Sequence, residues 1–225
     1  MSKDLRVVLI KLADRACNLE TLGYLPPDKQ KRIAQETMDI FVPIASRLGI
    51  GEFQGKLEDG SFRYLMPDEY KTLQKTAVPV IEARINYLKM ASKKLTDILR
   101  ENGLECRITY RAKTWYSLYR KLLKYERDIS KIYDIVAMRI VVPAIDDCYN
   151  VLGVIHSVWR PLPGRIKDYI ALPKPNGYQS IHTTVFADKG VITEIQIRTE
   201  KMNEQAEFGI AAHWYYNESK QTRKL

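Results

Sequence analysis

The stretch VITEIQIR, residues 191–198, decides the fold. Apolar and polar side chains alternate along it, and successive side chains of a β-strand point to opposite faces of a sheet. The segment is therefore expected to be a strand with one face in the core. The other face carries a row of functional groups, Glu194, Gln196 and Arg198.

A second alternating segment, residues 180–187, places His182 and Thr184 on one face. If the two strands pair, these side chains extend the same polar row. An edge strand that faces water would show the same alternation, and a lone histidine such as His182 is more often structural than a ligand.

The period of the hydrophobic pattern changes after Gly103. Before it, apolar residues recur at three- and four-residue spacing, which predicts helices. They are expected from Leu5 to about Leu19, from Pro27 to Leu48 with a bend at Pro43, and from Pro67 to Asn102. The glycines of residues 49–60 are expected to punctuate the stretch between the last two helices.

After Gly103 the pattern alternates between strands and helices. Strands are predicted at residues 104–110, 134–142, 180–187 and 192–198, and helices near residues 115–125, 146–158 and 201–216. This mixed order predicts an α+β fold, in which helices flank a sheet.

A cationic segment, RAKTWYSLYRK at residues 111–121, joins a predicted strand to a predicted helix. Lys113, Ser117 and Lys121 follow one another at four-residue steps and align as one stripe on the helix. A helix N-terminus with lysines and a hydroxyl group nearby can hold phosphate. An exposed basic helix face is the alternative explanation.

Asp134 opens an otherwise apolar predicted strand that contains Arg139. A carboxylate at the start of a buried strand needs a cationic partner or a metal ion. The spacing of five residues sends the two side chains to opposite faces, so a shared site would need a bulge. A plain salt bridge is the simpler interpretation.

A loop rich in turn-forming residues, at 165–178, presents cations and the aromatic ring of Tyr178. Such a ring could stack on a purine base while nearby cations hold its phosphates.

Composition gives limits on the class of protein. The 225 residues are 45% hydrophobic, and no segment approaches the roughly 18 consecutive apolar residues of a membrane helix. The three cysteines are widely spaced and form no CxxC pair, so a cytoplasmic location is expected. Residues 1–75 carry 12 basic against 11 acidic side chains, and the remaining excess of the +9 net charge falls in residues 76–225. A basic partner surface is expected there.

Together these segments resemble the RelA/SpoT alarmone synthetases. The resemblance covers essentially all of residues 104–216 and is carried by the motifs RAKTWYSLYRK, YDIVAMRIVV, GRIKDYIALPKPNGYQSIHT, EIQIRT and AEFGIAAHW. It implies a nucleotidyltransferase-like fold with a mixed β-sheet. It also implies transfer of pyrophosphate from ATP to the 3′-hydroxyl of GTP or GDP, which releases AMP.

The family resemblance also implies roles for individual residues. Arg111 and Arg139 would sandwich the adenine of ATP, and Lys113, Ser117 and Lys121 would hold its phosphates. Asp134 and Glu194 would bind Mg²⁺, with Glu194 also activating the 3′-hydroxyl. The guanosine nucleotide would be bound by Arg165, Lys167, Asp168, Lys174, Asn176, Tyr178, His182, Gln196 and Arg198. Thr114 stands where a histidine is common in the family.

The first part of the chain, residues 1–75, resembles the end of the family's HD-type hydrolase domain through KLADRACNLETL, residues 11–22. The resemblance implies that Asp14 would be one Mn²⁺ ligand and that Asn18 and Thr21 would line the pocket. The remaining ligands, a histidine and an HD pair, would precede residue 1. The expected domains are therefore an all-helical hydrolase remnant at 1–75, without hydrolase activity, and a synthetase domain at 76–225.

Two other classes of function are less consistent with the sequence. A non-catalytic module that binds a guanine nucleotide or RNA would need cations but would gain nothing from Asp134 and Glu194, unless a metal is held. A P-loop or protein kinase is disfavoured because no GxxxxGK[ST], HRD or DFG stretch occurs. ATP and GTP or GDP are the expected partners. Contact with membrane, ribosome or tRNA is not expected, since the family's C-terminal regulatory domains are absent from this sequence.

Overall fold

The structure is a computed structural model that describes residues 4–212. The chain forms two compact units. The first contains residues 4–73, 114–116 and 204–212, and the second contains Gln74–Lys113 and Ser117–Asn203. Within residues 4–212, no helix combines the length and hydropathy that crossing a membrane requires.

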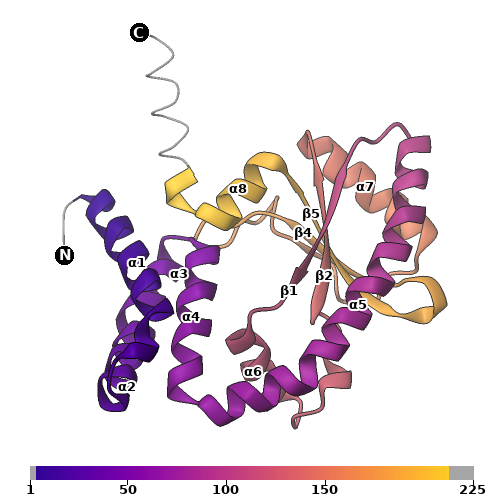
Figure 1. Ribbon diagram of the computed structural model, residues 1–225. Coiled ribbons are helices and arrows are strands. Elements are labelled where there is room, and N and C mark those ends of the chain that lie inside the picture. Colours follow the sequence, from indigo (N-terminus) through magenta and orange to yellow (C-terminus); the bar gives the residue numbers. More distant parts are fainter. Residues whose placement is uncertain (1–3, 213–225) are drawn as a thin grey trace. The chain divides into compact units, whose positions relative to one another are not determined.

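Helices build the first unit (Figure 1). They are α1 (Leu5–Glu20), η1 (Leu22–Tyr24), α2 (Pro27–Glu36), η2 (Thr37–Phe41), α3 (Val42–Arg47), α4 (Gly51–Leu65) and the first turns of α5 (Pro67–Glu101). Their apolar faces meet in one core that contains Leu12, Leu19, Leu22, Ala34, Ala45, Ile50 and Leu57. The predicted helical character of this part is confirmed.

The expected second helix is divided into three segments. A π-helical stretch, η2, separates α2 from α3, and the backbone N–H of Val42 donates to the carbonyl of Thr37. Pro43 occupies the first turn of α3 because it has no N–H to donate to the preceding turn, and its ring would clash with that turn. The change of hydrogen-bond pattern lies in η2, directly before α3 and its Pro43, and the bend itself stays a prediction.

The glycines of residues 49–60 do not interrupt the chain as expected, because most of this stretch forms α4. A Cβ atom on Gly60 would lie 3.0 Å from Leu19 Cδ1, so the missing side chain lets α1 pack closely on α4. Glycine costs about 1 kcal/mol in a helix relative to alanine, and this close packing offsets that cost.

The second unit contains a five-stranded sheet with the order β1-β2-β5-β4-β3. The strands are β1 (Arg107–Ala112), β2 (Val136–Val142), β3 (Lys167–Asp168), β4 (Ile181–Phe186) and β5 (Ile192–Thr199). β2 and β5 run parallel, and the other neighbours are antiparallel. This mixed sheet, flanked by helices, confirms the predicted α+β class.

Helices cover one face of this sheet. They are α7 (Ile145–Val158) and the later part of α5, joined to the strands by several hydrogen bonds. The Arg84 guanidinium donates to the carbonyl of Ile192 at 3.1 Å, and His156 contacts Thr183 at 2.9 Å. All seven residues of β2 are buried. The remaining elements are α6 (Trp115–Lys124), η3 (Ile129–Lys131), η4 (Asp188–Gly190) and α8 (Glu200–Phe208).

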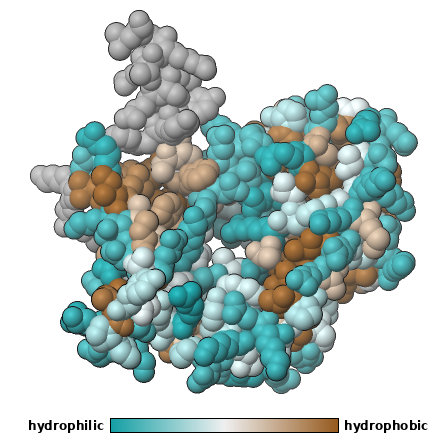
Figure 2. Space-filling model, in the orientation of Figure 1, coloured by the Kyte–Doolittle hydropathy of each residue, from teal (hydrophilic) through white to brown (hydrophobic). Residues whose placement is uncertain are grey.

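Most predicted elements of the second half are present within a few residues. The helix expected at 201–216 begins at Glu200 as α8, and its last residues, from His213 on, lie outside the described part of the chain. Figure 2 shows hydrophilic side chains over much of the visible surface, with hydrophobic side chains in separate smaller areas.

Gly209 should be the least replaceable glycine of the first unit. Its φ of +54° disfavours other residues, and an added Cβ would lie 2.3 Å from the Leu48 carbonyl oxygen. We expect Gly209→Ala to lower the free energy of unfolding by more than about 1 kcal/mol. Gly153→Ala is the control, because nothing lies within 4 Å of its added Cβ in α7. It should be neutral or stabilising by up to about 1 kcal/mol in chemical denaturation. Equal effects of the two substitutions would contradict this account.

Candidate functional site

Strand register gathers the predicted polar side chains on one face of the sheet. Gln196 of β5 pairs with Arg139 of β2 on one side and with His182 of β4 on the other, and Glu194 pairs with Thr184. Directly paired residues point to the same face. The expectation that His182 and Thr184 extend the polar row of β5 is therefore confirmed. The same face also receives Arg107, Thr109 and Arg111 from β1 and Lys167 from β3.

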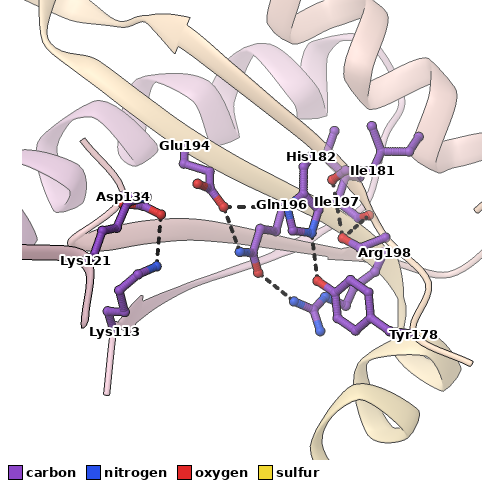
Figure 3. Close-up of polar contacts among 11 residues, drawn as sticks. Lys113, Lys121, Asp134, Tyr178, Ile181, His182, Glu194, Gln196, Ile197 and Arg198 are labelled. Atoms are coloured by element: carbon purple, nitrogen blue, oxygen red, sulfur yellow. Dashed lines mark hydrogen bonds and ion pairs between the residues drawn. The ribbon is translucent and has the colours of Figure 1, made fainter. Parts of the chain in front are cut away.

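The polar residues of β5 are linked to one another along the strand (Figure 3). Gln196 donates from Nε2 to Glu194 Oε1 at 3.0 Å, and it accepts at Oε1 a hydrogen bond from Arg198 at 2.7 Å. Arg198 is fully buried, so its charge needs such partners. The amide of Gln196 thus fixes both the carboxylate and the guanidinium.

Tyr178 lies at the other end of this row (Figure 3). The Arg198 guanidinium stands 5.5 Å from the centre of its ring, and Lys174 Nζ stands 5.0 Å from it. Its hydroxyl group contacts His182 Nε2 at 2.7 Å. The loop is shaped by Asn176, whose Oδ1 accepts a hydrogen bond from the Tyr178 backbone N–H at 3.3 Å. The aromatic and cationic residues of the loop therefore meet the sheet.

His182 is a neutral residue in this arrangement. Burial, followed by the positive charge of Arg198 and nearby lysines, lowers its pKa to about 3. A neutral ring can accept a hydrogen bond from the Tyr178 hydroxyl group at Nε2 and carry its own N–H at Nδ1. Nδ1 lies 3.6 Å from Glu194 Oε1. His182 therefore bridges the aromatic ring and the carboxylate without adding a charge.

Asp134 forms ion pairs with two lysines. Lys113 Nζ lies 2.9 Å from Oδ2, and Lys121 Nζ lies 2.5 Å from Oδ1. Burial acts to raise the pKa of Asp134, but the two ammonium groups outweigh it and hold the pKa below its usual value. Asp134 precedes β2, which begins at Val136, so the rule of alternating faces does not apply to it. The salt bridge considered for Asp134 is thus present, with lysines in place of Arg139.

Arg139 instead lies on the polar face of the sheet. It is 8% exposed and donates from a terminal nitrogen to Asn203 Oδ1 at 3.1 Å. Arg111 lies two positions from Thr109 on β1, and Thr109 pairs with Arg139. Both arginines therefore share one face, as the expected adenine site requires.

A surface hollow of about 570 Å³ lies beside α6. It is lined by two residues of the predicted stripe and by three others, Ser117, Lys121, Arg120, Lys124 and Tyr125. Arg120, Lys124 and Tyr125 are not among the site residues predicted from the sequence. Their spacing of three or four residues from Ser117 or Lys121 is the pattern that indicates a shared helix face.

The N-terminus of α6 has a protein cap. The carboxylate of Asp59 accepts hydrogen bonds from the backbone N–H groups of Trp115 and Tyr116 at 3.1 and 2.9 Å. These two groups are therefore occupied, and the interpretation of this helix end as a phosphate cradle is wrong for them. The sequence could not show it, since Asp59 is more than fifty residues away.

The loop residues preceding β4 divide between the two faces. Lys167 pairs with His182 and joins the polar face, whereas Asp168 pairs with Ile181 and belongs to the other. Asp168 accepts hydrogen bonds from the backbone N–H groups of Ile170 and Ala171 and from the Tyr149 hydroxyl. Asp168 therefore has structural partners, and Arg165 is exposed. Lys174 and His182 contact Tyr178 directly, whereas nucleotide binding by Arg165 and Asp168 stays a prediction.

The predicted hydrolase residues lie at the end of α1. Asn18 donates to Asp14 Oδ2 at 3.1 Å, and the Thr21 hydroxyl donates to the carbonyl of Asn18 at 3.4 Å. Within residues 4–212, no group of three or more histidine, cysteine, aspartate or glutamate side chains is placed to hold a metal ion.

The mixed sheet with flanking helices is nucleotidyltransferase-like, and one of its faces carries Glu194 and several cations, with Tyr178 at its end. Two family models match the chain. The first, described as a region found in RelA / SpoT proteins, matches residues 110–221, and the second, an HD domain, matches residues 1–51. The chain belongs to the RelA/SpoT family.

Among curated relatives, a probable guanosine-3′,5′-bis(diphosphate) 3′-pyrophosphohydrolase of Synechocystis is 50% identical over 220 residues, 97% of this chain and 29% of its own length. The bifunctional (p)ppGpp synthase/hydrolase SpoT of Escherichia coli is 48% identical over 225 residues, 99% of this chain and 32% of its own length. The chain thus spans about a third of these relatives. The crystal structure of small alarmone synthetase 2 from Bacillus subtilis shares 30% identity over 65% of this chain and 82% of that one, with a TM-score of 0.48.

Asp59 should stabilise the first unit through its contact with the α6 terminus. Loss of a capping side chain typically costs about 0.5–2 kcal/mol, so Asp59→Ala should lower the free energy of unfolding by that amount in chemical denaturation. Asp97→Ala is the matched control, because Asp97 is exposed on α5. That substitution should change stability by less than about 0.5 kcal/mol. The capping role would be rejected if both variants unfolded like the parent chain.

Proposed function

We propose that the chain transfers pyrophosphate from ATP to the 3′-hydroxyl of GTP or GDP and releases AMP. The observation that carries this proposal is the arrangement of the polar sheet face with the Asp134–lysine cluster. Within one unit, cations for a polyphosphate, two carboxylates and an aromatic platform come from segments far apart in the sequence. The names of the curated relatives, which include a bifunctional (p)ppGpp synthase/hydrolase, support the same reaction.

In this proposal ATP binds along the β1–α6 side. Arg111 and Arg139 would stack on the adenine with their planar guanidinium groups. Lys113, Ser117 and Lys121 would hold the phosphates, since two ammonium groups and a hydroxyl already cluster there. Three-dimensional clustering of cations is the arrangement that a polyphosphate recognises.

The guanosine nucleotide would bind at the opposite end of the polar row. The Tyr178 ring would stack on guanine, and Lys174 lies beside that ring. His182 and Gln196 would keep the ring and Glu194 in fixed positions through the contacts described above. Asn176 would act mainly by shaping the loop.

The carboxylates suit a hard divalent cation such as Mg²⁺, which prefers a few carboxylate oxygens together with substrate phosphates. The two ammonium groups at Asp134 show that a positive charge is already accommodated at this carboxylate. When bound, Mg²⁺ would neutralise the phosphates, and Asp134 and Glu194 would hold it.

Glu194 would accept the proton of the 3′-hydroxyl as its oxygen attacks the β-phosphorus. The bond between the β-phosphorus and the oxygen that bridges to the α-phosphorus then breaks, and that oxygen leaves as part of AMP. Glu194 suits this role because Gln196, which donates a hydrogen bond to its carboxylate, is a neutral amide.

Incubation with ATP, GTP and Mg²⁺, followed by nucleotide separation, tests the proposal. AMP and a guanosine nucleotide with two added phosphates should form. Release of ADP together with a guanosine nucleotide that gains a single phosphate would exclude pyrophosphate transfer.

The purified 225-residue chain should leave the pyrophosphorylated guanosine nucleotide intact when Mn²⁺ is added, because its three histidines lie at 156, 182 and 213, away from Asp14 in the sequence. Mn²⁺-dependent release of pyrophosphate would reject that expectation.

Glu194→Gln should lower turnover by about 10²- to 10⁴-fold while the fold and guanosine nucleotide affinity stay nearly unchanged. The amide keeps the shape of the side chain but cannot take the proton. Turnover, melting temperature and GDP affinity should be measured on one preparation. Glu200→Gln is the control, since Glu200 forms an exposed ion pair with Arg107. Near-normal turnover of Glu194→Gln would remove this residue from the catalytic role.

The two nucleotide sites should separate by mutation. Tyr178→Ala should raise the KM for the guanosine nucleotide by about tenfold or more, because one stacked base is worth about 1–3 kcal/mol. Arg111→Ala should raise the KM for ATP instead, and Arg111 is exposed, so the fold should tolerate its loss. Steady-state kinetics with each substrate varied in turn would decide. A similar loss toward both substrates in both variants would contradict these assignments.

A further inference from the structure

The Asp134 carboxylate is fully engaged by the protein itself. Oδ2 faces the ammonium group of Lys113 (Figure 3), and Oδ1 faces that of Lys121. The Asp134 side chain is 16% exposed, and the two lysine side chains are 26% and 28% exposed. Water therefore screens these ion pairs only partly, and the cluster of one carboxylate and two ammonium groups is well defined.

The proposed function gives this cluster two roles that conflict with each other. Asp134 is to hold a divalent cation, and Lys113 and Lys121 are to hold phosphates. A cation on a carboxylate oxygen would stand next to an ammonium group on the same oxygen. In a partly buried site, two like charges at such a distance repel strongly. The lysines must therefore move away before Asp134 can bind a metal ion.

We infer that Lys113 and Lys121 keep Asp134 closed to a free divalent cation until a polyphosphate draws their ammonium groups away. The inference rests on the proposed assignment of these lysines to ATP. According to this inference, the metal site forms only when the nucleotide binds. The lysines are then positioning residues for Asp134 as well as phosphate ligands.

The charges of the cluster favour this order. One carboxylate with two ammonium groups carries a formal charge of +1, which repels a free divalent cation and attracts a polyphosphate. The complex of ATP with a divalent cation suits both the lysines and the carboxylate. Its phosphate oxygens replace the Asp134 carboxylate as partners of the lysines, and its cation can then bind the carboxylate. The charged residues of the neighbouring polar row, Glu194 and Arg198, carry opposite formal charges, so they leave this balance unchanged.

Binding of Mn²⁺ alone, without nucleotide, tests the inference directly. Electron paramagnetic resonance reports the free Mn²⁺ in a titration of the chain. The parent chain should bind weakly, and the double variant Lys113→Met with Lys121→Met should bind on the order of tenfold more tightly or better. The gain should disappear when Asp134→Asn is added. Each single variant should show part of the increase in Mn²⁺ affinity, so the inference can still be tested if the double variant does not fold.

Lys124→Met is the matched control. Lys124 lies on the same helix and lines the same hollow, but no ion pair joins it to Asp134. It removes one positive charge without opening the carboxylate, so it should leave Mn²⁺ binding near that of the parent chain. The inference is overturned if the parent chain binds Mn²⁺ as tightly as the double variant, or if Lys124→Met gives an equal gain.

Calorimetry in EDTA adds a metal-free measurement. Asp134→Asn should bind a non-transferable ATP analogue more tightly than the parent chain, because the phosphates no longer compete with Asp134 for the lysines. Weaker or equal binding would contradict the inference.

The AMP assay separates the two proposals. Absence of AMP with the expected Mn²⁺ pattern rejects the proposed function alone, and AMP release with equal Mn²⁺ binding in all variants rejects the lysine role alone.

Discussion

The pairing of β5 between β2 and β4 is the constraint on which the site depends. Its register sets Gln196 beside both Arg139 and His182, and Glu194 beside Thr184. A slip of one residue would turn every side chain of β5 to the other face. The buried apolar residues Ile195 and Ile197 oppose such a slip, because it would expose them and bury Glu194. The hydrophobic core therefore fixes the polar face.

The polar face carries charges that are costly to bury. Arg198 is fully buried and Arg139 nearly so. An isolated charge in such a place would cost several kcal/mol, which explains why amide groups stand beside both, Gln196 for one and Asn203 for the other. Both of these partners are amides, so they accept hydrogen bonds from the two guanidinium groups without adding a charge.

The two carboxylates occupy opposite kinds of surroundings. Asp134 is held by two cations, which keep its pKa low and its charge compensated. Glu194 is held by a neutral amide and faces a neutral imidazole. Under the proposed function, these two side chains of almost the same chemistry would have different tasks, Asp134 in exchange between cations and Glu194 in contact with the reacting hydroxyl group.

The sequence by itself determined the strands, the polar row of β5 and its extension through His182, because alternation along a strand is a local property that the sheet preserves. It also carried the motifs that mark the family. The tertiary structure decided what depends on distant residues. The cap of α6 comes from Asp59, the glycines of α4 serve helix packing, and Asp168 turns away from the polar face because of its register with Ile181. The double ion pair of Asp134 likewise joins the segment before β2 to Lys113, which follows β1, and to Lys121 of α6. Such contacts follow from how elements pack in space, and no local pattern records them.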